Sequence, residues 1–136
     1  MIDQGLVSIL AADAGVTALL ATGDARSIFQ MVVPEDESAY PCIGYQFVGG
    51  SSAPTFDTSG LQRSRVQIDC WAVTPEGAKN LAEAVRKALN GFHGYLSDGT
   101  VLSNAMMLHP GIDFFSADSR FFRRMLEFYL LYTFNS

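Results

Sequence analysis

The segment QRSRVQIDCWAVTPEGAKNLAEAVRKAL, residues 62–89, decides the fold because a strand pattern in it runs directly into a helix pattern. Between residues 61 and 74 apolar and polar side chains alternate, and this period of two predicts a strand with one face in the core. The two rows are Val66, Ile68, Cys70 and Ala72 on one side, and Arg65, Gln67, Asp69 and Trp71 on the other. The second row is therefore expected to meet water or a partner.

A helix is expected to follow this strand at once. Thr74 supplies an N-cap, Pro75 the first helical position, and Glu76 a carboxylate at the positive end of the helix dipole, while Gly91 marks the end. The apolar positions form one stripe, made of Ala78, Leu81, Ala82, Val85, Ala88 and Leu89. Because alanine is small, the helix is expected to lie close against a sheet.

The N-terminal part predicts one helix and two strands. Apolar residues recur at helical spacing through residues 1–21, with a break near Gly15 and with Asp13 able to cap a second turn. SIFQMVV, residues 27–33, predicts a strand that stops at Pro34.

A second strand is expected to begin at Pro41, in PCIGYQFVGG, after the acidic turn EDES. The next stretch, residues 49–60, is rich in Gly, Ser and Thr, a composition typical of a mobile loop. Its length is unusual for a loop in a compact domain, which suggests a functional role.

The C-terminal part predicts further strands. Residues 100–108 and the IDFF sequence that follows Pro110 and Gly111 form either one bent strand or two short ones. Residues 121–134 could wind as an amphipathic helix, but their many aromatic side chains favour a strand.

That last strand is expected to be apolar on both faces. One row holds Leu126, Phe128, Leu130, Tyr132 and Phe134, and the other holds Met125, Tyr129 and Leu131 beside Glu127 and Thr133. A sheet covered by helices on one side needs only the first row. The second row therefore implies another covering, from a helix, a long loop or a neighbouring subunit.

These elements predict an α+β fold with a mostly antiparallel β-sheet and helices packed on one face, in the order helix(es)-β-β-β-α-β-β. The chain has 136 residues, of which 49% are apolar, enough for a core of its own. We therefore expect a single domain over residues 1–136.

The charge of the chain is acidic and unevenly distributed. The formal net charge is −5; residues 1–60 contain seven acidic residues and one arginine, a net −6, while residues 61–136 carry eight bases and seven acids, a net +1. Such a chain is expected to repel nucleic acid. No apolar run is long enough to span a bilayer, and the start MIDQGL lacks a basic signal region, so synthesis in the cytosol and no contact with membranes are expected.

No catalytic signature is present in the sequence. His93 and His109 lack the partners that zinc sites need, and Cys42 and Cys70 are expected to be reduced packing residues. There is no GxSxG, GxxxxGK[ST] or GxGxxG motif. The sequence therefore predicts a protein that is not an enzyme, with no catalytic residues, no cofactor and no metal.

Five arginines could instead form a contact patch. Arg63 and Arg65 lie at strand spacing on one face, and Arg120, Arg123 and Arg124 gather before the last strand. The interleaved aromatic side chains, Phe121 and Phe122, favour a protein interface over a nucleic-acid site. The alternative is that these arginines are ordinary strand residues, paired across strands with Asp69 or Glu127.

Several local strings resemble a known family, the tail-completion or tail-terminator proteins of long-tailed bacteriophages, prophages and gene-transfer particles. The similar strings are ADAGVTALLA, SIF, YPCIGYQFVGG, QRSRVQIDCWAVTPEGAKNLAEAVRKAL and SRFFRRMLEFYLLYTF. The strand RVQIDCWA with its turn and alanine-rich helix carries most of the resemblance, which covers nearly the whole chain.

The resemblance implies a structural virion protein, made in the host cytoplasm, that forms a homo-oligomeric ring, typically a hexamer, at the head-proximal end of the tail. The ring would end polymerisation of the tail tube protein and join the tail to the head-completion or stopper protein. DNA would pass through it without specific binding, as the acidic charge favours. The alternatives are a head-completion or minor capsid protein, and a small assembly adaptor or chaperone that is not an enzyme.

The residues expected to contact neighbours or the tube lie in the long loop, on the polar face of the strand at 61–74, and around the arginine cluster. They are Ser51, Ser52, Phe56, Asp57, Arg63, Arg65, Trp71, Arg120, Phe121, Arg123 and Arg124. For Trp71 the alternative is packing under the following helix. Glu35, Asp36 and Glu37 are candidates for lumen or inter-subunit contacts, and a solvated turn is the alternative.

Overall fold

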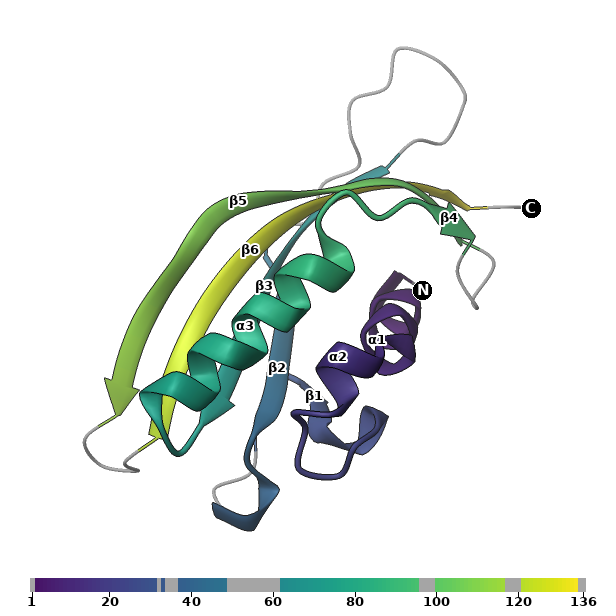
Figure 1. Ribbon diagram of the computed structural model, residues 1–136. Helices are drawn as coiled ribbons and strands as arrows, with labels where there is room; N and C mark the ends of the chain where they lie inside the picture. Colours follow the sequence, from purple (N-terminus) through teal and green to yellow (C-terminus); the bar gives the residue numbers. More distant parts are fainter. Residues whose placement is uncertain are drawn as a thin grey trace.

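The computed structural model describes residues 2–31, 33, 37–48, 62–95, 100–116 and 121–134. The helices are α1 (Ile2–Ala12), α2 (Ala14–Thr17) and α3 (Pro75–Leu89), with 3-10 turns η1 (Ala25–Ser27) and η2 (Glu37–Ala39). The strands are β1 (Ile28–Gln30), β2 (Cys42–Phe47), β3 (Gln62–Ala72), β4 (Gly94–Tyr95), β5 (Thr100–Ser116) and β6 (Phe121–Phe134). Figure 1 shows the strands arching over the helices, which all lie on one side of the sheet, so the α+β class and the one-sided helices are confirmed.

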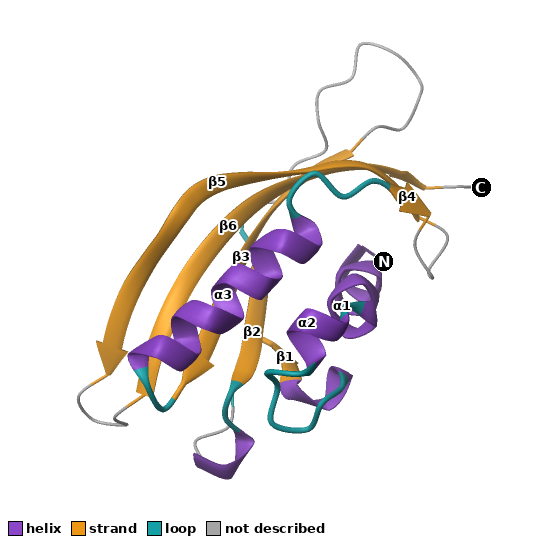
Figure 2. Cartoon of the chain, viewed as in Figure 1, coloured by secondary structure: helices purple, strands orange, loops and turns teal. Residues whose placement is uncertain are grey.

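The six strands form one sheet in the order β1-β2-β3-β6-β5-β4 (Figure 2). β1 runs parallel to β2, whereas every other neighbouring pair is antiparallel. The sheet is therefore mixed, which corrects the expectation of a mostly antiparallel sheet at this edge. The cause is the connection through η2, which carries the chain back so that β2 starts at the same end as β1.

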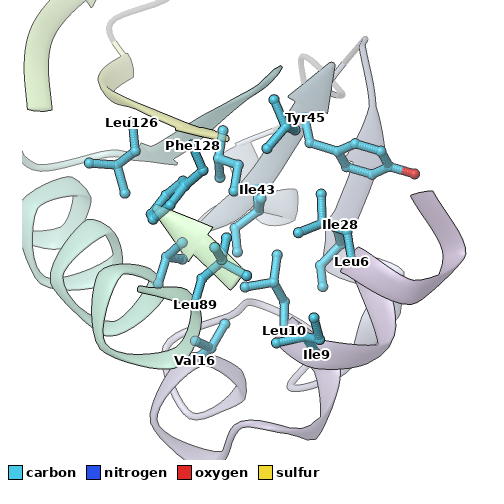
Figure 3. Packing of buried hydrophobic residues seen from close by; sticks show 14 of the residues in the cluster. Leu6, Ile9, Leu10, Val16, Ile28, Ile43, Tyr45, Leu89, Leu126 and Phe128 are labelled. Carbon is cyan, nitrogen blue, oxygen red and sulfur yellow. The ribbon is translucent and has the colours of Figure 1, made fainter. Parts of the chain in front are cut away.

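The core lies between the helices and the sheet. Figure 3 shows Leu6, Leu10 and Val16 of the N-terminal helices pointing toward Ile43 and Phe128 of the sheet. α3 completes this layer with a buried stripe made of Ala78, Leu81, Ala82, Val85 and Leu89. Its strongest contacts are with β3 and β6, so the segment at 62–89 does build the centre of the fold.

The ends of α3 follow the sequence prediction. The Thr74 hydroxyl accepts a hydrogen bond from the backbone N–H of Gly77 at 3.0 Å, and Pro75 occupies the first turn. Beyond the C-cap residue Asn90, Gly91 has a φ of +81°, a conformation that glycine adopts without strain. At the N-terminus, the carboxylate of Asp13 accepts from the backbone N–H of Val16 and separates α1 from α2, which confirms the predicted capping role.

Several boundaries differ from the sequence prediction. The strand expected at 27–33 is confined to Ile28–Gln30, because Met31 takes a φ of 67° that no strand contains. β5 is one strand with register shifts against β6, the first of the two alternatives left open for this segment, and His109 lies within it. The short β4 was not predicted, and the loop expected at 49–60 lies outside the described residues.

Among the described residues, none of the helices has the length and apolarity that crossing a membrane would require.

Candidate functional site

One face of the sheet carries none of the described α-helices, and five of the seven predicted contact residues that the structure describes lie on it. The pairing of β3 with β6 places odd-numbered residues of both strands on the same side, away from the core residues Val66, Ile68 and Phe128. We call this side of β3 and β6 the helix-free face. It holds Arg63, Arg65, Gln67, Asp69 and Trp71 of β3, and Phe121, Arg123, Met125, Glu127, Tyr129 and Leu131 of β6.

An ion pair lies at the centre of the helix-free face. Arg65 Nε donates to Glu127 Oε2 at 2.7 Å, and the Arg65 Nη2 atom contacts the same oxygen. The Glu127 side chain is only 10% exposed, against 41% for Arg65. This pair is the cross-strand pairing considered as an alternative, so Arg65 is committed to a partner within its own chain.

The other arginines are spread along both faces. Arg63 is exposed and its guanidinium lies 5.0 Å from the centre of the Tyr129 ring, a cation–π contact. Arg123 lies 5.3 Å from the ring centre of Trp71, with an Nη1 atom 3.8 Å from Asp69 Oδ2. Arg124 is paired in register with Cys70, so it faces the helices.

The described arginines of this group therefore do not all share one face of the sheet. Adjacent residues of a strand point to opposite faces, and this alternation separates Arg123 from Arg124. Arg63 and Arg65 do share a face, as predicted. Tyr129, the partner of Arg63, was missed because only the register of β3 against β6 brings the two side chains together.

Trp71 belongs to a second apolar cluster on the helix-free face. This cluster contains Tyr40, Cys42 and Phe121 with Phe29, Val33, Ala39 and Trp71 around them. The rings of Tyr40 and Phe121 stack at 3.9 Å between centres, and Tyr40 meets Trp71 edge-on at 6.3 Å. Packing of Trp71 under α3 is therefore wrong, because Cys70 and Ala72 are the neighbours that face the helix side.

Phe121 is buried within this cluster, whereas Trp71 stays partly exposed at its border. Gly44 makes the cluster possible, since a Cβ at that position would come within 2.9 Å of Val33 Cγ1. Val33, Ala39 and Tyr40, which lie between β1 and β2 in the chain, thus cover one end of the helix-free face.

Cys42 and Cys70 are both free and buried. Cys42 is paired in register with Trp71, while Cys70 is paired with Ile43, so the two thiols lie on opposite faces of the sheet. Burial raises the pKa of the Cys42 thiol to about 12, and burial with the nearby Asp69 charge raises the pKa of Cys70 as well. Neither thiol has the character of a nucleophile.

Within the described ranges, no group of three or more His, Cys, Asp or Glu side chains could hold a metal ion. His93 is exposed in the turn after α3, where its Nδ1 atom lies 3.3 Å from the carbonyl oxygen of Gly91.

Seven of the predicted contact residues lie outside the described residues: Glu35, Asp36, Ser51, Ser52, Phe56, Asp57 and Arg120. Glu37 begins the 3-10 turn η2. A contact of any predicted residue with another protein stays a prediction.

Replacing Asp69 by asparagine is expected to leave the protein at least as stable at neutral pH. Burial raises the pKa of Asp69, against the opposing effects of Arg123 and of the Gln67 hydrogen bond. Because the pKa of Asp69 is higher in the folded than in the unfolded state, protonation of this carboxyl stabilises the wild-type fold. This stabilisation is fully present below the unfolded-state pKa and is lost as the pH rises through the folded-state pKa. The stability of Asp69→Asn relative to wild type should therefore fall as the pH is lowered from about 7 to about 4.

Urea denaturation at the two pH values measures this difference. A variant that is less stable than wild type at neutral pH, and equal to it in acid, would show instead that the ion pair with Arg123 dominates.

Comparisons with known proteins identify the family. The chain matches the family described as "Tail completion protein gp17" over residues 4–133. It shares its fold with a chain from "Virion of native gene transfer agent (GTA) particle", with a TM-score of 0.63 and 22% identity over 94% of this chain and 91% of that one. No curated protein sequence matches. The chain belongs to the gp17 family of tail completion proteins, which are structural components of the virion and not enzymes.

Proposed function

We propose that this protein forms a homohexameric ring at the head-proximal end of the phage tail tube. There it ends polymerisation of the tube protein and joins the tail to the head-completion or stopper protein. The observation that carries the proposal is membership of the tail completion family over residues 4–133. The chain acts in this role as one domain over residues 1–136, without a cofactor.

The helix-free face supports a role in assembly. Beside the central ion pair it presents the partly buried apolar side chains Met125, Tyr129 and Leu131, and Met106 of β5 is 48% exposed on the same side. Arginine, tyrosine and methionine are the residue types that are enriched in protein interfaces. Contacts that repeat head to tail around a ring close into an object of finite size.

The charge of the chain supports passage of DNA through the ring. At a net −5 the protein repels the phosphate backbone rather than retaining it. The predicted partners are therefore other proteins, namely further copies of this chain, the tube protein and the stopper.

The test is the oligomeric state of the purified protein, measured by light scattering, alone and after mixing with tail tubes. A hexamer and tubes of uniform length are expected. A protein that stays monomeric in the presence of tubes and leaves their length unregulated would contradict the proposal. Mass spectrometry of purified virions tests the adaptor or chaperone alternative, which predicts that the protein is absent from the mature particle.

A further inference from the structure

A groove lies between α3 and β6 on the side of the sheet that carries the helices. It encloses about 200 Å³, and the buried side chains of Ala82 and Leu126 lie at its base. Around them stand Lys79, Glu83 and Arg86 of α3, and Arg124 of β6. An apolar base with charged walls is a shape that a short peptide segment can enter.

The walls of the groove are positively charged. Among the residues that line the groove, Lys79, Arg86 and Arg124 are cations and Glu83 is an acid. Glu83 accepts a hydrogen bond from Arg86 Nε at 3.0 Å. The hydrogen bond from Arg86 lowers the pKa of Glu83, and the charges of Lys87 and Arg124 lower it further.

The sequence also contains a short anionic segment, in the connection between two strands that are not next to the groove. The groove stands over β6, next to β5, whereas residues 35–37, with the sequence Glu-Asp-Glu, connect β1 to β2. Figure 1 places β5 and β1 on opposite sides of the molecule. Asp24, another acid near the β1 end, already pairs with Arg26 at 3.0 Å, so the segment 35–37 is the stronger candidate.

We propose that the groove between α3 and β6 receives the acidic segment 35–37 of a second copy of this chain. The proposal rests on the proposed ring, because a head-to-tail contact brings opposite ends of neighbouring sheets together. The carboxylates of one copy then offset the excess positive charge of the next, which fixes the register between subunits.

The test reverses the charges of each side separately and then together. The groove variant is Lys79→Glu with Arg86→Glu, the segment variant is Glu35→Lys with Asp36→Lys and Glu37→Lys, and the third variant combines all five changes. Each single-side variant should raise the protein concentration needed for half-maximal assembly by roughly tenfold or more. The combined variant should restore assembly toward the wild-type concentration, which a loss of folding could not produce.

Arg26→Glu is the control, because its side chain is 77% exposed, pairs with Asp24 and does not line the groove. It should assemble as the wild type does. If the wild-type protein does not assemble, the ring itself is wrong. If the wild type assembles and the groove and segment variants assemble equally well, or if the combined variant is not restored, the groove proposal is wrong and the ring stands. The proposal would also be wrong if the wild-type protein retarded a DNA duplex in a gel and the groove variant assembled normally but did not retard it. The groove would then bind the phosphates of DNA.

Discussion

Replacing Phe128 by alanine is expected to lower the free energy of unfolding by about 3–5 kcal/mol. Phe128 is 0% exposed and is the largest of the fully buried side chains among the residues that the structure describes. It lies in the middle of β6, with Leu126 and Leu130 beside it in the same row of the core. Because domains of this size are stable by only about 5–15 kcal/mol, the change removes a large share of the total.

Two effects lower the free energy of unfolding: the variant no longer buries the phenyl ring of Phe128, and the helices and the sheet cannot close the cavity that the ring leaves. Urea denaturation followed by the fluorescence of Trp71, the only tryptophan, measures it. Met106→Ala is the control, because this side chain on the next strand is half exposed and should change the free energy of unfolding by about 1 kcal/mol or less. A Phe128→Ala variant as stable as this control would show that β6 does not pack on the helices as described.

The centre of the fold could be predicted from local patterns alone. The alternation of apolar and polar residues over 61–74 predicts β3, and the N-cap at Thr74 predicts the start of α3; the predicted bounds differ from the observed ones by one or two residues. Both predictions succeed because each pattern lies within a single strand or helix turn. The same holds for the two rows of β6, where Phe128 faces the core and Tyr129 the other side. The periodicity of the sequence is sufficient to predict which face of a strand or helix is buried, because both faces belong to the same short segment.

The parts that were not predicted depend on contacts between distant segments. Whether β1 runs parallel to β2 depends on the path of the connection through η2. The spacing of apolar residues in the sequence gives no information about that path. The partners of Arg65 and Arg123 follow from the register of β3 against β6, some sixty residues away in sequence. Neighbours in sequence such as Arg123 and Arg124 look like a cluster, but a strand sends them to opposite faces.

Reversing the charge of Arg65 by substitution with glutamate is expected to destabilise the fold by about 2–4 kcal/mol. The new carboxylate would stand beside Glu127, whose side chain is only 10% exposed and would lose its cationic partner. The partial exposure of Arg65 lets water reduce this cost, so the value lies below that of a fully buried pair. Thermal and urea unfolding of the monomer measure it, and a stability equal to wild type would show that the ion pair contributes nothing to the fold.

Arg63→Glu is the matched change that tests assembly without disturbing the fold. Arg63 lies on the same face of the same strand, two residues away, but it is exposed and contacts the ring of Tyr129 rather than a buried charge. Its free energy of unfolding should fall by about 1 kcal/mol or less. If the helix-free face is an interface, this variant should still fold but assemble at higher concentration than wild type. A folded Arg63→Glu protein that assembles normally would exclude this face from the ring contact, whereas a loss of assembly in Arg65→Glu alone would reflect only its weakened fold.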